Sequence, residues 1–209
     1  MEGKIIKYIK AEYDPEVILL AGSRAKGKET DGSDWDLFLL GPKKGNGGFI
    51  DFEDQLLDIT FKSWPEENKS LTIPSGPLWP IKVLLDNSQD RLSSILNKTK
   101  EDFGKGPLDL YKASSLERFE KLDSWKRKIE KHRDNPVVEF FYAGVFYEFA
   151  IRAWFELQNK WSLSPAEATT YIKENDNSFY ELLNFFVHST STERSKFTKQ
   201  ILDKLNNLK

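Results

Sequence analysis

The strongest constraint on this chain is a pair of short apolar runs that bracket a polar turn. Residues 17–21 read Val-Ile-Leu-Leu-Ala and lead directly into Gly-Ser, whereas residues 37–40 read Leu-Phe-Leu-Leu and follow directly after Asp-Trp-Asp. Apolar runs of this length, bounded by turn-forming residues, are typical of buried strands. The pattern predicts two strands, with the polar residues 22–36 placed where the first strand ends and the second begins.

Two aspartates stand at the start of the second apolar run. Because successive side chains point to opposite faces of a strand, we expect Asp34 and Asp36 to share one face and Trp35 to occupy the other. Two neighbouring carboxylates repel each other unless a cation lies between them. Mg²⁺ prefers oxygen ligands and often shares its coordination shell with substrate phosphates. Asp34 and Asp36 are therefore candidate magnesium ligands.

The Gly-Ser turn has the features of a phosphate-binding loop. Gly22 permits backbone geometry that a Cβ would block. Ser23 can begin a helix, and its hydroxyl and the following backbone N–H groups suit an anion. Arg24 and Lys26 could neutralise a triphosphate, or they could be solvated surface cations. Together with the aspartates, the turn indicates metal-assisted phosphoryl or nucleotidyl transfer, whereas an Asp-rich loop before an ordinary strand is the plainer alternative.

This ordered set of strand, Gly-Ser, Asp-x-Asp and strand resembles the DNA polymerase β-like nucleotidyltransferase superfamily. Within it, the pattern is most similar to small nucleotidyltransferase-domain proteins and to the kanamycin and lincosamide adenylyltransferases. The family motif adds a third carboxylate between apolar residues on a later strand. Asp58, between Leu57 and Ile59, fits this description, and Asp51 beside a Gly-rich turn is a weaker competitor. The resemblance covers roughly residues 1–100.

The resemblance implies roles for particular residues. The expected catalytic residues and metal ligands are Asp34, Asp36 and Asp58. These would hold one or two Mg²⁺ ions against ATP or another nucleoside triphosphate, and Asp58 could also act as a base. The expected nucleotide-binding residues are Gly22, Ser23, Arg24 and Lys26.

A second base is expected by analogy alone. In kanamycin-type enzymes a glutamate from the helical domain serves as base towards the acceptor hydroxyl, and Glu148 is the candidate here. Glu148 and Arg152 are spaced i, i+4, so they could also simply pair with each other.

Turn-forming residues crowd the first half of the chain. Eleven of the twelve glycines and seven of the nine prolines lie at or before residue 107. This change predicts a domain boundary near residue 107. The resemblance implies an α+β fold, with a nucleotidyltransferase catalytic domain over 1–106 built on a mixed sheet with flanking helices. An all-helical bundle domain is expected over 107–209.

Hydrophobic spacing predicts the individual elements. Strands are expected over 16–21, 35–40 and 79–86, with one strand or a hairpin within 49–63. Helices are expected over 4–13, 23–28, 64–71, 88–103, 110–133, 136–160, 165–174, 178–189 and 193–207. The helix over 136–160 is apolar almost all round and should form the buried centre of the bundle.

Composition excludes several classes of protein. The formal net charge is −2 and the pI is about 5.9, so no overall basic field favours nucleic acid. The chain has no cysteine, which excludes disulfides and thiolate metal sites. No apolar run approaches a membrane span and no signal peptide is evident, so we expect a cytoplasmic protein.

The expected activity is transfer of a nucleoside monophosphate, AMP from ATP being the expected case, to a hydroxyl of a small-molecule acceptor. One alternative is modification of RNA or of a partner protein, as in antitoxin-like pairs. The basic run over 126–133 is its specific support. Another alternative is a catalytically inactive nucleotide-binding relative. A homodimer is expected only by analogy, and the acceptor is not specified by the sequence.

Overall fold

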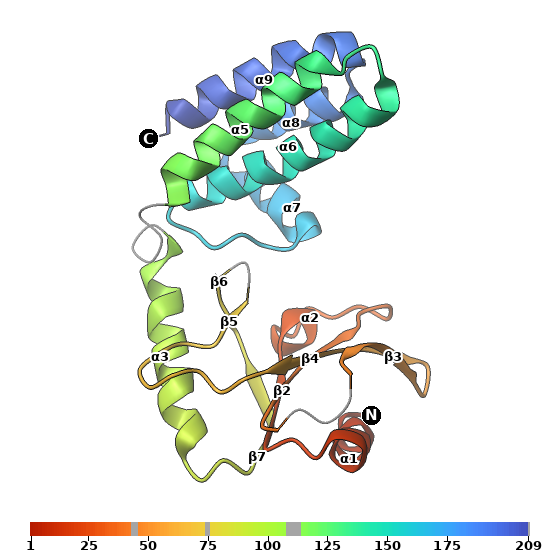
Figure 1. Cartoon of the computed structure of the whole chain (residues 1–209), viewed down its shortest axis with the longest axis vertical. Coiled ribbons are helices and arrows are strands. Elements are labelled where there is room, and N and C mark those ends of the chain that lie inside the picture. Colours follow the sequence, from red (N-terminus) through yellow and green to blue (C-terminus); the bar gives the residue numbers. More distant parts are fainter. Residues whose placement is uncertain (43–45, 74–75, 108–113, 209) are drawn as a thin grey trace. The chain divides into compact units, whose positions relative to one another are not determined.

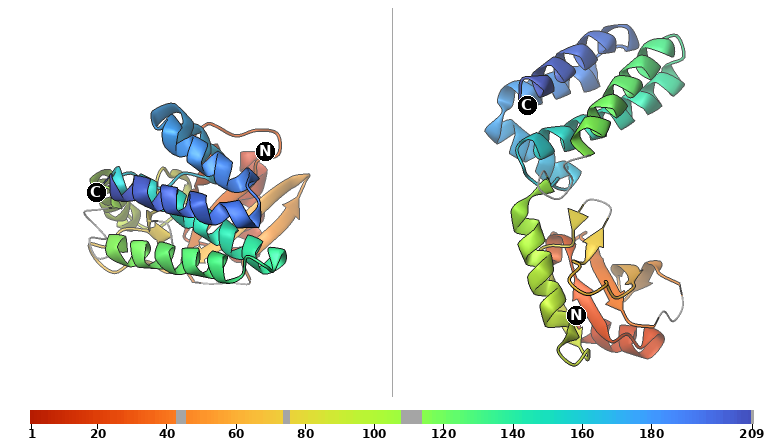
Figure 2. Two further views of the ribbon diagram at one scale, coloured as in Figure 1. Left: turned by 90° about the horizontal axis from the view of Figure 1, so that it is seen from above. Right: turned by 60° about the vertical axis from the view of Figure 1, so that its left-hand side comes forward.

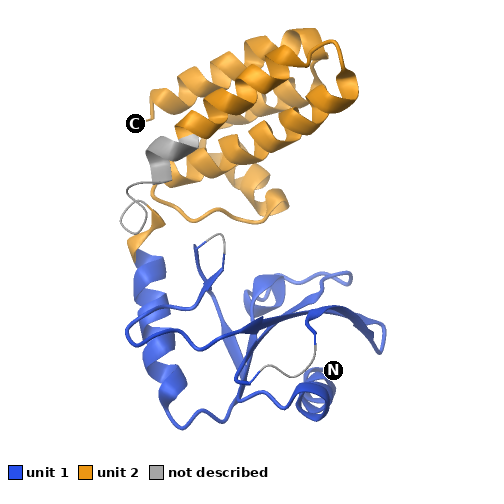
Figure 3. Cartoon of the chain, viewed as in Figure 1, with its two compact units in different colours: residues 1–104 blue, residues 105–209 orange. Residues whose placement is uncertain are grey.

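The computed structural model describes the chain except for residues 43–45, 74–75, 108–113 and 209, and for 114–118 it describes the backbone alone. The chain divides into two compact units, Met1–Gly104 and Lys105–Lys209 (Figure 3). The first unit contains a mixed sheet with helices, and the second contains helices, so the fold class is α+β.

The first unit is built on a five-stranded sheet in the order β3-β4-β2-β1-β7 (Figure 1). The strands are β1 (Val17–Leu20), β2 (Trp35–Leu40), β3 (Gly48–Phe52), β4 (Gln55–Lys62) and β7 (Lys82–Asp86). Strand β1 is antiparallel to both of its neighbours, β2 and β7, whereas the central strand β2 is parallel to β4, and β3 is antiparallel to β4. A separate two-stranded sheet joins β5 (Thr72–Ile73) to β6 (Gly76–Pro77).

Two hydrophobic cores cover opposite faces of the larger sheet. On one face, α1 (Glu2–Tyr13) packs Ile5 and Ile9 against β2 and β4. On the other face, α3 (Arg91–Lys105) packs Leu92 and Ile95 against β1 and the end of β2. The short helix α2 (Gly22–Ala25) follows β1 directly. Strand β1 is thus buried on both faces, as its continuous apolar run requires, whereas Phe49 on the edge strand β3 and Val83 on the edge strand β7 remain exposed.

Two predicted elements of the first unit differ from the structure. Residues 64–71 form no helix, although Pro65 suits a helix start. Instead, the indole Nε1 of Trp64 donates to Glu16 Oε2 at 3.2 Å, and the backbone N–H of Leu71 donates to Thr99 Oγ1 at 2.9 Å. Between these two contacts the chain makes a turn, in which the backbone N–H of Lys69 donates to the Glu66 carbonyl at 3.1 Å. The strand expected over 79–86 begins only at Lys82.

The second unit contains five helices in the part of the chain that the structure describes. They are α5 (Ser114–Lys131), α6 (Pro136–Leu157), α7 (Pro165–Asn175), α8 (Asn177–His188) and α9 (Ser191–Asn206). Helix α5 packs against α6 and α9, and α8 packs against α7 and α9 (Figure 2). Residues 110–113 of the helix predicted over 110–133 lie outside the described residues. None of the described helices is long and apolar enough to cross a membrane.

The prediction that α6 is buried throughout is wrong at its first turns. Val137, Phe140 and Phe141 are 81%, 69% and 64% exposed. From Ala143 onward the helix contributes fully buried side chains such as Phe146 to the core. Apolar composition therefore identified the helix but did not show which of its turns the other helices cover.

Candidate functional site

The sheet register brings two of the predicted aspartates together. Asp36 on β2 and Asp58 on β4 are direct partners in neighbouring parallel strands, so their side chains leave the same face of the sheet. Both are partly exposed, whereas Trp35 on the opposite face is buried against the α1 core. Asp34 lies one residue before β2 begins. The aspartates therefore gather near the start of β2, beside the middle of β4.

The charges of these carboxylates act on one another. Burial, followed by the negative charges of Asp34 and Asp58, raises the pKa of the Asp36 carboxyl above its usual range, and the positive charge of Lys26 opposes this shift. Burial and the charge of Asp34 likewise raise the pKa of Asp58. The three groups thus lie within electrostatic reach and form a centre of negative charge.

The Gly-Ser turn lies directly against this centre. Gly22 has a φ of 65°, in the left-handed region that favours glycine. A Cβ at this position would overlap Oδ2 of Asp36. The backbone N–H of Ala21 donates to the carbonyl of Asp36 at 2.9 Å, and the N–H groups of Lys26 and Lys28 donate to the Ser23 carbonyl. Gly22 is therefore required both for the turn and for its close approach to Asp36.

Arg24 makes a different set of contacts from those expected of a phosphate ligand. Its Nε donates to the carbonyl of Asp34 at 3.0 Å, and its Nη2 donates to the carbonyl of Ser33 at 2.7 Å and to Gln55 Oε1 at 3.2 Å. The guanidinium carbon lies 4.5 Å from the centre of the Trp35 ring. This side chain is already occupied by the loop that carries Asp34.

Two predicted alternatives can be placed relative to other residues. Asp51 lies on the edge strand β3, where its register partner is Leu56, so Asp58 and not Asp51 is the carboxylate opposite Asp36. Glu148 lies on α6 of the second unit, where its Oε1 accepts a hydrogen bond from Arg152 at 2.6 Å. The pairing that the i, i+4 spacing suggested is therefore present.

Sequence reasoning missed Gln55. Its Oε1 accepts hydrogen bonds from Arg24 and from the indole Nε1 of Trp35, at 3.2 Å each, and its Nε2 donates to the carbonyl of Asp54. A signal was present, because Gln55 shares a strand face with the buried residues Leu57 and Ile59. A polar residue on the apolar face of a strand needs a buried partner.

The donor set suits a hard divalent cation. Carboxylate oxygens are the ligands that Mg²⁺ prefers. Within the described part of the chain, no three acidic, histidine or cysteine side chains are arranged to hold a metal ion as they stand. Mutual repulsion keeps carboxylates apart when no cation lies between them, so metal binding requires rearrangement of these side chains.

A cavity of about 260 Å³ lies elsewhere in the first unit. It is lined by residues 65–69, which follow the end of β4, and by the first turns of α3. Because Asp58 lies at the middle of β4, the second half of the strand, up to Lys62, separates the aspartates from this cavity.

The family comparison covers the segment that carries the aspartates. Residues 3–67 match the family model described as "Polymerase beta, Nucleotidyltransferase". The matched segment includes the Gly-Ser turn, the Asp-x-Asp pair and Asp58. A comparison with curated proteins found no match. Residues 3–67 therefore carry a nucleotidyltransferase domain of the DNA polymerase β-like superfamily.

Proposed function

We propose that this protein transfers a nucleoside monophosphate from a nucleoside triphosphate, with ATP as the expected donor, to a hydroxyl group of a small-molecule acceptor. The observation that carries the proposal is the register pairing of Asp36 with Asp58, with Asp34 and the Gly22 turn beside them. All four positions lie within the segment that matches the nucleotidyltransferase family.

Asp34, Asp36 and Asp58 would hold one or two Mg²⁺ ions. The metal would neutralise phosphate charge and lower the pKa of the attacking hydroxyl. This assignment rests on the donor chemistry and on the convergence of the three carboxylates.

Other groups of the chain would orient the triphosphate, offset its charge and accept the proton of the acceptor hydroxyl. The turn at Gly22 and Ser23 would orient the triphosphate through backbone N–H groups and the serine hydroxyl, and Lys26 would offset its charge. The acceptor oxygen bonds to the α-phosphorus, the bond to the departing pyrophosphate breaks, and the acceptor proton passes to Asp58. Glu148 is proposed as an additional base on the acceptor side, and it would first have to leave Arg152.

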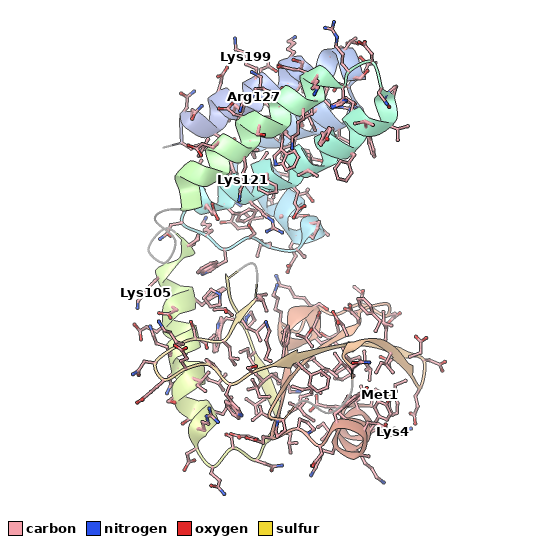
Figure 4. The ribbon with its side chains drawn as sticks, viewed as in Figure 1. Met1, Lys4, Lys105, Lys121, Arg127 and Lys199 are labelled. Carbon is pink, nitrogen blue, oxygen red and sulfur yellow. The ribbon has the colours of Figure 1, made fainter. Side chains whose placement is uncertain are left out.

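The alternative of an RNA acceptor depends on the basic run over 126–133. Several of its cations have neighbours of their own on the helix: Lys126 lies 3.8 Å from Glu130, and Lys128 lies over the ring of Trp125. Arg127, labelled in Figure 4, is exposed. Cations near a helix C-terminus are favoured without any ligand, so this run gives an RNA acceptor little support.

Transfer from ATP labelled at the α-phosphate tests the proposal. The full-length protein is incubated with Mg²⁺ and separate pools of hydroxyl-bearing small molecules, RNA and protein, with Asp36→Asn as the control. We expect label in a small molecule with stoichiometric pyrophosphate release. Label in RNA or protein would favour the macromolecular alternative, and binding without transfer would favour an inactive relative. Absence of both transfer and Mg²⁺-dependent nucleotide binding would overturn the proposal.

A further inference from the structure

We propose that Arg24 is a positioning residue that fixes Asp34 beside Asp36 and Asp58, and that it does not bind phosphate. The inference rests on the proposed function, since it assigns these aspartates to the metal and nucleotide site. The sequence suggested that Arg24 binds phosphate, whereas in the structure its guanidinium donates to the backbone carbonyls of Ser33 and Asp34.

The guanidinium of Arg24 holds the loop before β2 at two adjacent points. Its Nε and Nη2 donate to the carbonyls of Asp34 and Ser33, at 3.0 Å and 2.7 Å. A planar guanidinium can grip two neighbouring carbonyls in a fixed geometry, whereas a lysine ammonium acts as a single point of charge. Arg24 thereby fixes the backbone of Asp34 itself.

Gln55 extends this grip to a third segment. Its Oε1 accepts hydrogen bonds from both Arg24 and Trp35, and Gln55 is the first residue of β4, the strand that carries Asp58. The network therefore joins α2, the loop of Asp34 and the start of β4. These are the three segments that contribute the candidate site residues.

The location of the guanidinium argues against phosphate binding. It lies over the ring of Trp35, and Trp35 belongs to the core on the α1 face of the sheet. Asp36 and Asp58 point from the opposite face. A nucleotide held by the aspartates would therefore meet Lys26, whose charge already acts on Asp36, and not Arg24.

The expected consequence of losing Arg24 is a loosened Asp34. The carbonyls of Ser33 and Asp34 would lose their donors, while the repulsion among the three carboxylates would remain. Substitution of groups that orient metal ligands typically weakens metal affinity by about 10- to 100-fold. We expect an effect of this size on the Mg²⁺ midpoint, with little change in overall folding.

Two variants separate positioning from phosphate binding. Arg24→Lys keeps the positive charge but loses the two-point grip, and Gln55→Leu removes an acceptor without changing any charge. An Arg24 that binds phosphate would tolerate Gln55→Leu, because that change leaves its guanidinium in place. A positioning network would not, so each variant should raise the Mg²⁺ midpoint for nucleotide binding, and excess Mg²⁺ should restore binding.

The matched control is Arg91→Lys. The guanidinium carbon of Arg91 lies 4.3 Å from the centre of the Trp64 ring, close to the 4.5 Å between Arg24 and Trp35, but Arg91 is on α3 and lines the cavity beside residues 65–69. This variant should leave the Mg²⁺ midpoint unchanged.

The primary readout is hydrogen exchange in the metal-free, full-length protein, because it does not depend on activity. Arg24→Lys and Gln55→Leu should speed exchange in residues 31–36 by about tenfold, while Arg91→Lys should not. Unchanged exchange in both variants would overturn the positioning role even if the wild type proves active. If the exchange result holds but the wild type binds no nucleotide with Mg²⁺, the proposed function fails, and with it the assignment of this loop to a metal site.

Discussion

The close approach of Gly22 to Asp36 ties the turn to the carboxylates at the scale of single atoms. Backbone conformation and space both select glycine at position 22, because a side chain would need a left-handed φ and would overlap the Asp36 carboxylate. Gly27 offers a comparison, since it has a φ of 64° but open space around its Cα. An alanine at either position would have to adopt a left-handed φ, but only an alanine at position 22 would also overlap the Asp36 carboxylate.

Gly22→Ala should abolish nucleotidyl transfer and Mg²⁺-dependent nucleotide binding. Gly27→Ala should cost only the strain of a left-handed alanine, about 1 kcal/mol of folding free energy, and should retain most binding. Calorimetric titration with a non-hydrolysable ATP analogue, together with thermal melts, measures both. Equal losses of binding in the two variants would show that backbone strain, and not contact with Asp36, is the cause.

Asp36→Asn should stabilise the metal-free protein while abolishing transfer. Burial and neighbouring negative charge raise the pKa of Asp36 in the folded state, so its ionised form opposes folding at neutral pH. This opposition is relieved as pH falls through the raised folded-state pKa. The wild-type Tm should therefore gain relative to the variant as the pH is lowered from neutral towards the ordinary carboxyl range. A Tm difference that does not change with pH would contradict this explanation.

The orientation of some single residues could be predicted from the sequence, but the contacts of others could not. The alternation of strand side chains predicted that Trp35 and Asp36 face opposite ways, and the burial of Trp35 confirms it. The partners of Arg24 could not be predicted, because a charged residue after a Gly-Ser turn has the same appearance whether it binds phosphate or carbonyls. One of the partners that hold Arg24 is Gln55, which lies 31 residues away in the sequence.

At the scale of elements, buried strands and capped helices were the most predictable. The strand over 35–40 has the predicted bounds, because a polar aspartate loop and a Gly-Pro pair delimit its apolar run. The segment over 64–71 was predicted wrongly, since its conformation is set by contacts with Glu16 and Thr99. Tertiary contacts overrode a local helix signal there.

Helix α8 depends on Asp176 at its N-cap. Burial alone would raise the pKa of Asp176, but hydrogen bonds from Ser178, Trp154, the Phe179 amide and Lys204 together lower it. Its stabilising contribution is therefore present above the pKa of the unfolded state and is lost as pH falls through the lower folded-state pKa.

Asp176→Ala should destabilise the protein by about 1–2 kcal/mol at neutral pH, the usual cost of losing a cap. The difference from the wild type should shrink in acid, below the ordinary carboxyl range. Urea denaturation at several pH values measures it, with Asp203→Ala on the exposed side of α9 as the control. A loss that is constant with pH would point to packing and not to the charged cap.

The whole molecule consists of two units with separate cores. The loss of glycine and proline near residue 107 anticipated a change of architecture, and the division into units falls between Gly104 and Lys105. The assignment of the two units as independent domains stays a prediction. The change in glycine and proline content reflects the number of turns in each half, and it does not measure how strongly the two halves stabilise each other.

A fragment of residues 1–106 should fold and bind nucleotide with Mg²⁺ but transfer nothing. It keeps both cores that cover the sheet and all three aspartates, and it lacks Glu148. Circular dichroism melts and calorimetric titration of the fragment, beside the full chain, test this. An unfolded fragment would show that the first unit depends on the second for stability.

The most direct test of the metal site is Mn²⁺ binding, followed by electron paramagnetic resonance in the presence of a non-hydrolysable ATP analogue. The wild type should bind Mn²⁺ in the complex, and Asp36→Asn and Asp58→Asn should each weaken this binding by about tenfold or more. A wild type that binds no Mn²⁺, or variants that bind it as tightly as the wild type, would contradict a site in which paired strands bring these carboxylates to one cation.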